Sequence, residues 1–359
     1  MIPYGRQSID DDDIAAVVAV LRSDLITQGP TIEAFEDALC RLTGARFAVA
    51  MSSGTAALHG AAHAAGLGPD DLVVTSPLSF AASANAARYV GAGVGFVDIE
   101  PDTLNLDPTA VPAAADALVA VHYAGLPIDL TRLNRRPRVV IEDAAHALGA
   151  VTPDGPVGSC AHSDMCCFSF HPVKTVTTGE GGAVTTNSPR LAEALRRFRH
   201  HGVTRSPEAA LWQYDIVDVG FNYRLTDLQA ALGISQLGKL NRFLDARTRL
   251  ADRYRAALAG DDRVELPPAA PDRYRHGYHL FPIRVDDRDR LFDDLRGKGV
   301  GVQVHYVPTY RFSSFAGTGS ADTHPATEAA FARLLSLPLF PALTDDEQDS
   351  VIAALQELL

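Results

Sequence analysis

One segment of this chain carries more information than any other: Phe168-Ser169-Phe170-His171-Pro172-Val173-Lys174-Thr175-Val176-Thr177-Thr178-Gly179-Glu180-Gly181-Gly182. It places a single lysine after an apolar run and just before a glycine-rich turn. A lone lysine beside glycine is usually a solvated loop charge. The segment by itself therefore assigns no chemical role to Lys174.

A second apolar segment lies upstream: Val139-Val140-Ile141-Glu142-Asp143-Ala144-Ala145-His146. An aspartate that ends a strand is usually a helix cap or a turn former. Here Asp143 and Lys174 both close strongly apolar runs, where an unpaired charge is unfavourable. Pyridoxal phosphate chemistry needs a lysine that forms an imine with the aldehyde and a carboxylate that keeps the pyridine nitrogen protonated. The two residues together predict a pyridoxal phosphate site.

The bulk composition bounds the class of protein. The chain has 359 residues, enough for one large domain and a smaller one. Its hydrophobic content of 47% and charged content of 21% argue against disorder. The net charge of -12 leaves no basic excess to neutralise phosphates. We therefore expect neither nucleic acid nor a membrane among its partners.

The cysteines and the N-terminal residues indicate an ordinary cytoplasmic protein. Cys40, Cys160, Cys166 and Cys167 form no CxxC pair, so we expect buried thiols rather than disulfides or a metal site. The N-terminal residues lack the apolar region of a signal peptide. No apolar run approaches the roughly 20 residues that span a bilayer.

Strand-like and helix-like segments alternate along most of the chain. The expected strands are Phe47–Met51, Leu72–Thr75, Val94–Val97, Ala117–Val121, Arg138–Glu142, Met165–Phe170 and Ala183–Thr186. The expected helices include Ala81–Tyr89, Leu191–Phe198 and one long helix, or two in line, over Leu225–Leu258. This alternation predicts an α/β fold with a mostly parallel sheet covered by helices on both faces.

The C-terminal part has a different pattern after a cluster of prolines at Pro267, Pro268 and Pro271. We place the domain boundary just before this cluster, giving a large domain over residues 1–262 and a small α/β domain over residues 263–359. The expected elements of the small domain are a strand, a helix, a second strand and a terminal helix: His279–Val285, Arg288–Lys298, Gly301–Tyr306 and Asp345–Leu359.

Candidate binding residues follow the strands, where ligands of such sheets bind. Ser53-Gly54-Thr55 opens a helix after the first strand, so its N–H groups and hydroxyls suit a phosphate monoester. The same three residues are also ordinary helix-cap chemistry. Asp143 ends another strand, and Ser169 and Lys174 flank a third. Phe80 could stack on an aromatic ligand, with a place in the core as the alternative.

Taken together, these motifs resemble the fold-type I, aspartate-aminotransferase-like enzymes, and more narrowly the DegT/DnrJ/EryC1/StrS family of nucleotide-sugar aminotransferases. The resemblance covers nearly the whole chain. Besides the segments around Asp143 and Lys174, it is carried by Leu25–Pro30, Ser52–Leu58, Gly220–Asp227 and Leu335–Pro338.

The resemblance implies roles for the reacting groups. Lys174 would bind the cofactor covalently and shuttle the proton, and Asp143 would pair with the pyridine nitrogen. His146 would lie near the cofactor ring and its 3-hydroxyl, and Phe80 would stack on the ring. Some family members carry histidine in place of the lysine and perform dehydration, so Lys174 favours transamination.

The resemblance also implies a phosphate site and a partner. Ser53, Gly54, Thr55 and Ser169 would hold the cofactor phosphate. Asn222 matches the position that reaches the phosphate of the neighbouring subunit's cofactor. The active unit should therefore be a homodimer with shared active sites.

Three segments resemble the transaminases of pseudaminic acid biosynthesis: Ile2–Gln7, His171–Thr178 and Gly299–Tyr310. This resemblance implies transfer of the amino group of L-glutamate to C4 of a UDP-linked 4-keto-6-deoxy-N-acetylhexosamine.

Three further residues are candidates for substrate contacts. His171 and Tyr306 would contact the sugar, with ordinary packing as the alternative. Arg224 would bind an anionic group, with an internal ion pair as the alternative.

Other functions remain to be separated by experiment. Another sugar aminotransferase, for example one that makes perosamine or a 3-amino sugar, would differ in its product. A paralogue that binds pyridoxal phosphate or the sugar nucleotide without turnover would fail to transfer an amine. An NAD-dependent enzyme is disfavoured because no GxGxxG motif follows the first strand.

Overall fold

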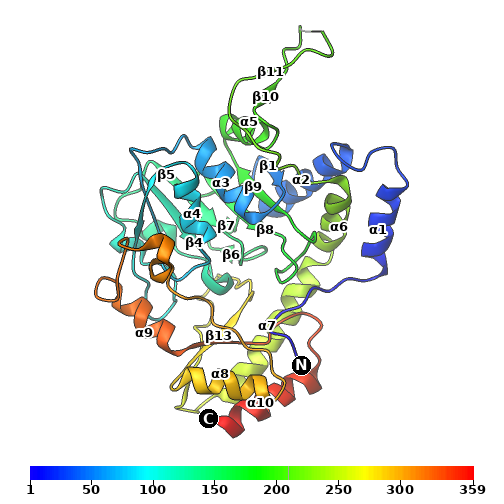
Figure 1. The fold of residues 1–359 in the computed structure, drawn as a ribbon. Coiled ribbons are helices and arrows are strands. Elements are labelled where there is room, and N and C mark those ends of the chain that lie inside the picture. Colours follow the sequence, from blue (N-terminus) through cyan, green and yellow to red (C-terminus); the bar gives the residue numbers. More distant parts are fainter. Residues whose placement is uncertain (209) are drawn as a thin grey trace.

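A seven-stranded sheet forms the centre of the computed structural model, which describes residues 1–208 and 210–359 (Figure 1). The strands lie in the order β1-β9-β8-β5-β4-β2-β3. Neighbouring strands are parallel except at β9, which is antiparallel to both β1 and β8. The predicted mostly parallel sheet is therefore confirmed. The strand bounds are β1 Phe47–Met51, β2 Leu72–Thr75, β3 Gly93–Phe96, β4 Ala117–Val121, β5 Val139–Asp143, β8 Met165–Ser169 and β9 Gly182–Thr186.

Helices cover both faces of this sheet. On β8, Cys167 packs into one core layer and its neighbour Cys166 into the other, because successive strand residues point to opposite faces. The first layer includes residues of α3, α4 and α5, and the second includes residues of α2, α6 and α7. The helix bounds are α2 Pro30–Thr43, α3 Gly54–Ala64, α4 Ala82–Tyr89, α5 Pro189–Phe198, α6 Asp227–Leu237 and α7 Leu240–Leu258.

The C-terminal part is a small antiparallel sheet, β12-β13-β14, with helices packed on it. Its elements are β12 Val264–Glu265, β13 Phe281–Val285, β14 Leu334–Leu337, α8 Arg288–Gly297, α9 Pro325–Arg333 and α10 Asp345–Leu358. Leu250, Tyr254 and Leu258 of α7 lie in the same core as Phe281 of β13. The domain boundary between residues 262 and 263 stays a prediction. Helix α7 lies before that boundary, yet its residues pack into the core of the C-terminal part.

The N-terminal segment returns to this C-terminal part (Figure 1). The N–H of Ile2 donates to the carbonyl of Gly299 at 2.8 Å, and the N–H of Gly301 donates to the carbonyl of Ile2 at 2.7 Å. Leu339 donates its N–H to the carbonyl of Tyr4 at 3.0 Å. Residues from the two ends of the described chain are thus hydrogen-bonded to each other.

A two-stranded ladder, β10 Val203–Thr204 and β11 Asp215–Ile216, projects from the opposite end of the molecule (Figure 1). Leu211 and Trp212 are 96% and 79% exposed. Ile14 and Leu21 of α1 Asp11–Leu21 are also exposed, at 55% and 57%. The remaining short strands are β6 Val151–Thr152 and β7 Gly155–Pro156.

The structure decides between two alternatives in one segment and corrects one expected element. Leu225–Leu258, expected as one long helix or as two, forms two helices, α6 and α7. The strand expected at Gly301–Tyr306 is absent from the described structure, and only Gln303 pairs, with Ser336 of β14. The ladder ends there because the next side chains turn inward, where His305 bonds the hydroxyl of Ser336 and Tyr306 bonds His146.

No helix in the described part of the chain is long and apolar enough to cross a membrane. The four cysteines are free thiols, three of them buried and Cys40 partly buried.

Candidate active site

A cavity of about 460 Å³ opens at the carboxyl ends of β5 and β8. Parallel strands bring their carboxyl ends to one edge of the sheet, so side chains that follow different strands meet there. Ten of the predicted site residues line this cavity: Ser53, Gly54, Thr55, Phe80, Asp143, His146, Ser169, His171, Lys174 and Tyr306.

Lys174 lies in the turn that follows β8, where its N–H donates to the carbonyl of His171 at 2.9 Å. Its Nζ is 3.5 Å from Nε2 of His279. Burial lowers the pKa of Lys174 to about 8, although the carboxylate of Asp143 acts to raise it and Arg247 lowers it further. The amine is therefore available without its proton at a pH where an ordinary lysine is charged.

Asp143 is the last residue of β5 and is only 6% exposed. Its Oδ1 accepts from the N–H of Ala145 at 3.1 Å, and its Oδ2 accepts from the hydroxyl of Ser83 at 2.6 Å. A carboxylate has about four lone-pair sites, so two such bonds leave acceptor capacity toward the cavity.

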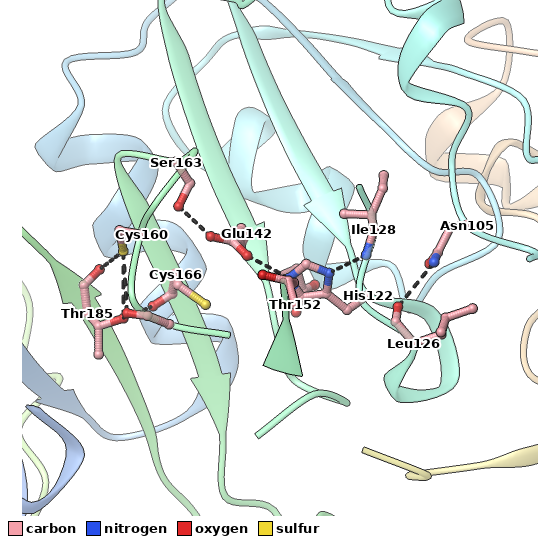
Figure 2. A network of polar contacts seen from close by, with 12 residues as sticks. Asn105, His122, Leu126, Ile128, Glu142, Thr152, Cys160, Ser163, Cys166 and Thr185 are labelled. Atoms are coloured by element: carbon pink, nitrogen blue, oxygen red, sulfur yellow. Dashed lines mark hydrogen bonds and ion pairs between the residues drawn. The ribbon is translucent and has the colours of Figure 1, made fainter. Parts of the chain in front are cut away.

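Glu142 precedes Asp143 and points to the other face of β5, away from the cavity. Figure 2 shows its carboxylate between Ser163 and His122, which lies 2.8 Å away through Nε2. The N–H of Ile128 donates to Nδ1 of His122, so the proton of a neutral His122 is on Nε2, facing Glu142. Burial acts to raise the pKa of Glu142, yet the bonds from His122 and Ser163 leave it lowered. These hydrogen bonds hold Glu142, and with it the end of β5, on the face of the sheet opposite to Asp143.

The start of α3 forms a close-fitting cradle against β8 and β9. A Cβ added to Gly54 would lie 2.7 Å from Cβ of Ser169, and one added to Gly182 would lie 2.3 Å from the carbonyl oxygen of Ser53. The hydroxyl of Ser53 accepts from the N–H of Ala56 at 3.0 Å, so the cap interpretation holds for this side chain. Among the described residues, no acceptor bonds the N–H groups of Gly54 and Thr55. These groups and the helix dipole suit an anion.

Aromatic and imidazole rings form another part of the cavity wall. The hydroxyl of Tyr306 lies 3.0 Å from Nε2 of His146, and burial raises the pKa of Tyr306, so this hydroxyl keeps its proton and can donate. Burial, and then the charge of Lys174, lowers the pKa of both His146 and His279. Phe80 is 63% exposed at the cavity, so its core alternative is wrong.

Two predicted residues lie elsewhere. Asn222 does not line the cavity of its own chain, and its predicted role concerns a neighbouring subunit. Nη1 of Arg224 lies 2.9 Å from Nδ1 of His200. No carboxylate pairs with Arg224 in the described part of the chain. The alternative of an internal ion pair is therefore wrong for the described residues. Arg224 lines a separate groove of about 440 Å³.

Several polar residues that line the cavity were not predicted as individual site residues, among them Tyr4, His279 and His305. Tyr4 reaches the cavity because its segment is bonded to the C-terminal part. His279 precedes β13, and a histidine at the start of an apolar strand was the only signal for it.

The cavity fits pyridoxal phosphate on the features of this chain. It holds a lysine with a lowered pKa, a buried carboxylate and a glycine-lined cradle with free N–H groups. Nδ1 of His146 and Nδ1 of His279 are buried without a hydrogen-bond partner among the described residues. In residues 1–208 and 210–359, no group of three or more His, Cys, Asp or Glu is placed to hold a metal ion.

Comparisons with known proteins agree with this chemistry. The model of the DegT/DnrJ/EryC1/StrS aminotransferase family matches residues 7–356. Spr1654 from Streptococcus pneumoniae, a candidate sugar aminotransferase in its PMP form, is 28% identical, with 100% of both chains covered and a TM-score of 0.92. The same protein is also known in a PLP form.

Two further solved structures are similar over the whole length. Helicobacter pylori PseC, an aminotransferase involved in the biosynthesis of pseudaminic acid, is 27% identical, with 99% of this chain and 98% of that chain covered and a TM-score of 0.91. The sugar aminotransferase CalS13 from Micromonospora echinospora is 30% identical, with 99% and 100% covered and a TM-score of 0.91.

Proposed function

The chain belongs to the DegT/DnrJ/EryC1/StrS aminotransferase family, and on that basis we propose that it aminates C4 of a UDP-linked 4-keto-6-deoxy-N-acetylhexosamine with L-glutamate as donor, a step toward pseudaminic acid. Its fold-type I architecture, its sugar aminotransferase activity and its pyridoxal phosphate cofactor follow from the family and from the relatives described above. The sugar, the nucleotide and the donor are the proposal.

The main support for the proposed reaction is that Lys174 and Asp143 line the same cavity. Support for the substrate comes from the cavity wall. Tyr4, His305 and Tyr306 belong to the two terminal segments that resemble the transaminases of pseudaminic acid biosynthesis, and all three line this cavity. Their hydroxyl and imidazole groups can bond sugar hydroxyls and amides.

Each residue has a defined task in this proposal. Bound pyridoxal phosphate supplies an aldehyde that takes up the amino group and a ring that accepts electrons. Lys174 would take a proton at Nζ from the α-carbon of the donor and deliver it to the cofactor carbon that keeps the amino group; in the second half-reaction it would move a proton the opposite way, to C4 of the sugar. Asp143 holds the proton of the ring nitrogen, and Phe80 covers one side of the ring. Gly54, Thr55 and Ser169 hold the phosphate.

The charge of the cavity supports a homodimer with shared active sites. Lys174 is the only lysine or arginine among the described lining residues, which also include Asp143 and Glu180. Glutamate and a sugar diphosphate are both anions, so binding them requires cations from outside this cavity. A second copy would supply them from the groove that holds Arg205 and Arg224. The exposed apolar residues of α1 and of the β10–β11 ladder are a surface suited to such a partner.

Mixing two inactive variants tests the shared site. Lys174→Ala lacks the covalent lysine, and Asn222→Ala lacks the residue proposed to act across the dimer. In a mixed dimer one site receives both native residues, so random mixing should restore about a quarter of wild-type activity. Failure to restore any activity in verified mixed dimers would refute a contribution of Asn222 to its neighbour.

Product analysis tests the reaction. L-glutamate should convert the cofactor band of the purified enzyme to that of the aminated cofactor, and the UDP-4-keto sugar should convert it back. Mass spectrometry and NMR of the product should show an amino group at C4. A cofactor band that glutamate leaves unchanged would refute the donor, and a band that only other keto sugars restore would refute the substrate.

A different keto sugar, aminated at C4 as in perosamine or at C3, is the alternative within the family. Identity with CalS13, at 30%, is no lower than with PseC, at 27%, so overall similarity does not select the sugar. Amination of a perosamine-type 4-keto precursor or of a 3-keto sugar, with the product identified by NMR, in place of the UDP-linked substrate would favour this alternative.

A further inference from the structure

Two buried serine hydroxyls link the cavity wall to Asp143. Ser83, the second residue of α4, is 1% exposed, and its Oγ lies 2.6 Å from Oδ2 of Asp143. Oγ of Ser79 lies 2.7 Å from Oγ of Ser83. Ser79 is 4% exposed and lines the cavity.

The donors and acceptors in this pair of hydrogen bonds can be assigned from the chemistry of the groups. An ionised carboxylate can only accept, so Ser83 donates its proton to Asp143. The oxygen of Ser83 is then free to accept from Ser79. Both serines have an alternative acceptor in the carbonyl of Phe80, but each of those contacts is longer, at 3.3 Å. The short contacts define a one-way series from Ser79 to Ser83 to Asp143.

The sequence of α4 gives no packing reason for a serine at this position. The buried residues around it are alanines, at positions 82, 84, 86 and 87. Serine is a weaker helix former than alanine, and a buried hydroxyl without a partner is unfavourable. The hydroxyl of Ser83 is therefore explained by the carboxylate that it contacts.

We propose that Ser83 is a positioning residue that keeps the proton shared by Asp143 and the cofactor's ring nitrogen on the ring, with Ser79 orienting the Ser83 hydroxyl. The inference rests on the role proposed above for Asp143. A hydrogen bond donated to a carboxylate favours its ionised form. When a carboxylate and a pyridine nitrogen share one proton, favouring the ionised carboxylate leaves the proton on the nitrogen.

The geometry supports this role in a second way. The N–H of Ala145 holds Oδ1, and the hydroxyl of Ser83 holds Oδ2. Both oxygens of Asp143 are thus fixed from the side of the protein, which sets the plane of the carboxylate. The ring nitrogen then meets an acceptor that does not have to reorient.

The test compares Ser83→Ala, Ser83→Cys and Ser79→Ala with the wild type. Ser76→Ala is the matched control, because Ser76 is also a buried serine, 2% exposed, but its Oγ accepts from the N–H of Leu78 and bonds no carboxylate among the described residues. The probe is pyridoxal phosphate labelled with nitrogen-15 in the ring, whose NMR signal reports protonation of the ring nitrogen. Thermal melts of the cofactor-free proteins check the fold.

Ser83→Ala should move the ring-nitrogen signal toward that of neutral pyridine and weaken cofactor binding about tenfold, the lower end of the range seen when hydrogen-bond partners of metal ligands are lost. Ser83→Cys, a weaker donor of similar shape, and Ser79→Ala should move the signal less in the same direction. The kcat with glutamate should fall in the same order with little change in KM, while Ser76→Ala should match the wild type.

Asp143→Asn separates failure of this inference from failure of the proposed site. If Asp143→Asn shifts the ring-nitrogen signal and folded Ser83→Ala and Ser79→Ala leave it at the wild-type position, the serines have no such role. If Asp143→Asn leaves the signal unchanged, the role of Asp143 is refuted and the inference falls with it.

Discussion

The lowered pKa of Lys174 predicts how the cofactor-free enzyme captures pyridoxal phosphate. Only the free amine can attack the aldehyde, so the capture rate should rise with pH and level off above the pKa of the lysine. Burial places this pKa at about 8, against 10.5 for an ordinary lysine. At pH 7.5 about one Lys174 in four would be a free amine, against about one in a thousand for an ordinary lysine.

The structure also predicts the direction in which a neighbour moves this midpoint. The charge of Asp143 acts to raise the pKa of Lys174. Asp143→Asn should therefore shift the midpoint of the capture rate to lower pH. The difference between 10.5 and about 8 corresponds to roughly 3 kcal/mol in favour of the free amine, so the midpoint of the wild-type enzyme should lie far below that of an ordinary lysine.

Stopped-flow absorbance measures this rate directly. The cofactor-free enzyme is mixed with pyridoxal phosphate across pH 6 to about 11, and free N-acetyl-lysine, with a midpoint near its reference pKa of about 10.4, is the control amine. A midpoint for the enzyme close to that of the control would refute the argument from burial. An upward shift in Asp143→Asn would refute the electrostatic argument.

Three further predictions follow from single contacts. Lys174→Ala should abolish turnover and remove the visible band of lysine-bound cofactor, and retained transamination would contradict the assignment. Gly54→Ala should weaken cofactor binding at least tenfold, since the new Cβ would lie 2.7 Å from Cβ of Ser169 and distort the phosphate cradle. Gly297→Ala is the control, because a Cβ there would meet no described atom within 4 Å. Equal affinities of the two variants for pyridoxal phosphate would refute the role of the cradle. Glu142→Gln should lower the free energy of unfolding in urea by about 2 kcal/mol at neutral pH, since the lowered pKa of Glu142 stabilises the fold above its unfolded-state pKa and this contribution is lost in acid. Glu193→Gln, which removes an exposed pair with Arg197, should cost less than about 0.5 kcal/mol, and a similar loss in both variants would refute the buried network.

The residues at strand ends were predictable because the rule that places them is local. Asp143 and Lys174 each follow an apolar run, and parallel topology brings such ends together. The direction of β9 does not follow from the strand itself, because Gly182–Thr186 is buried along its whole length and would be so in either orientation. The signal for its direction lies in the connection from β8 to β9, residues 170–181, which ends in a glycine-rich turn and contains no helix that could return the chain for a parallel strand.

Residues that depend on distant contacts were missed for a different reason. Tyr4 lies in the cavity only because its segment bonds Gly299 and Leu339, which a local pattern cannot show. The strand expected at Gly301–Tyr306 had the right composition, but His305 and Tyr306 have polar partners in the cavity wall that end the pairing. Arg224 likewise finds His200, a neighbour that no charge pattern indicated.

The return of the N-terminal segment to the C-terminal part has a consequence for the order of folding. Ile2 pairs with Val300, a contact that spans about 300 residues and is slow to form by the usual dependence on sequence separation. During synthesis the large sheet can assemble once β9 has left the ribosome, but Tyr4 cannot take its place until residues 299–339 follow. A nascent chain therefore presents Lys174 and Asp143 before the cavity wall is closed, and the finished site is among the last parts of the molecule to form.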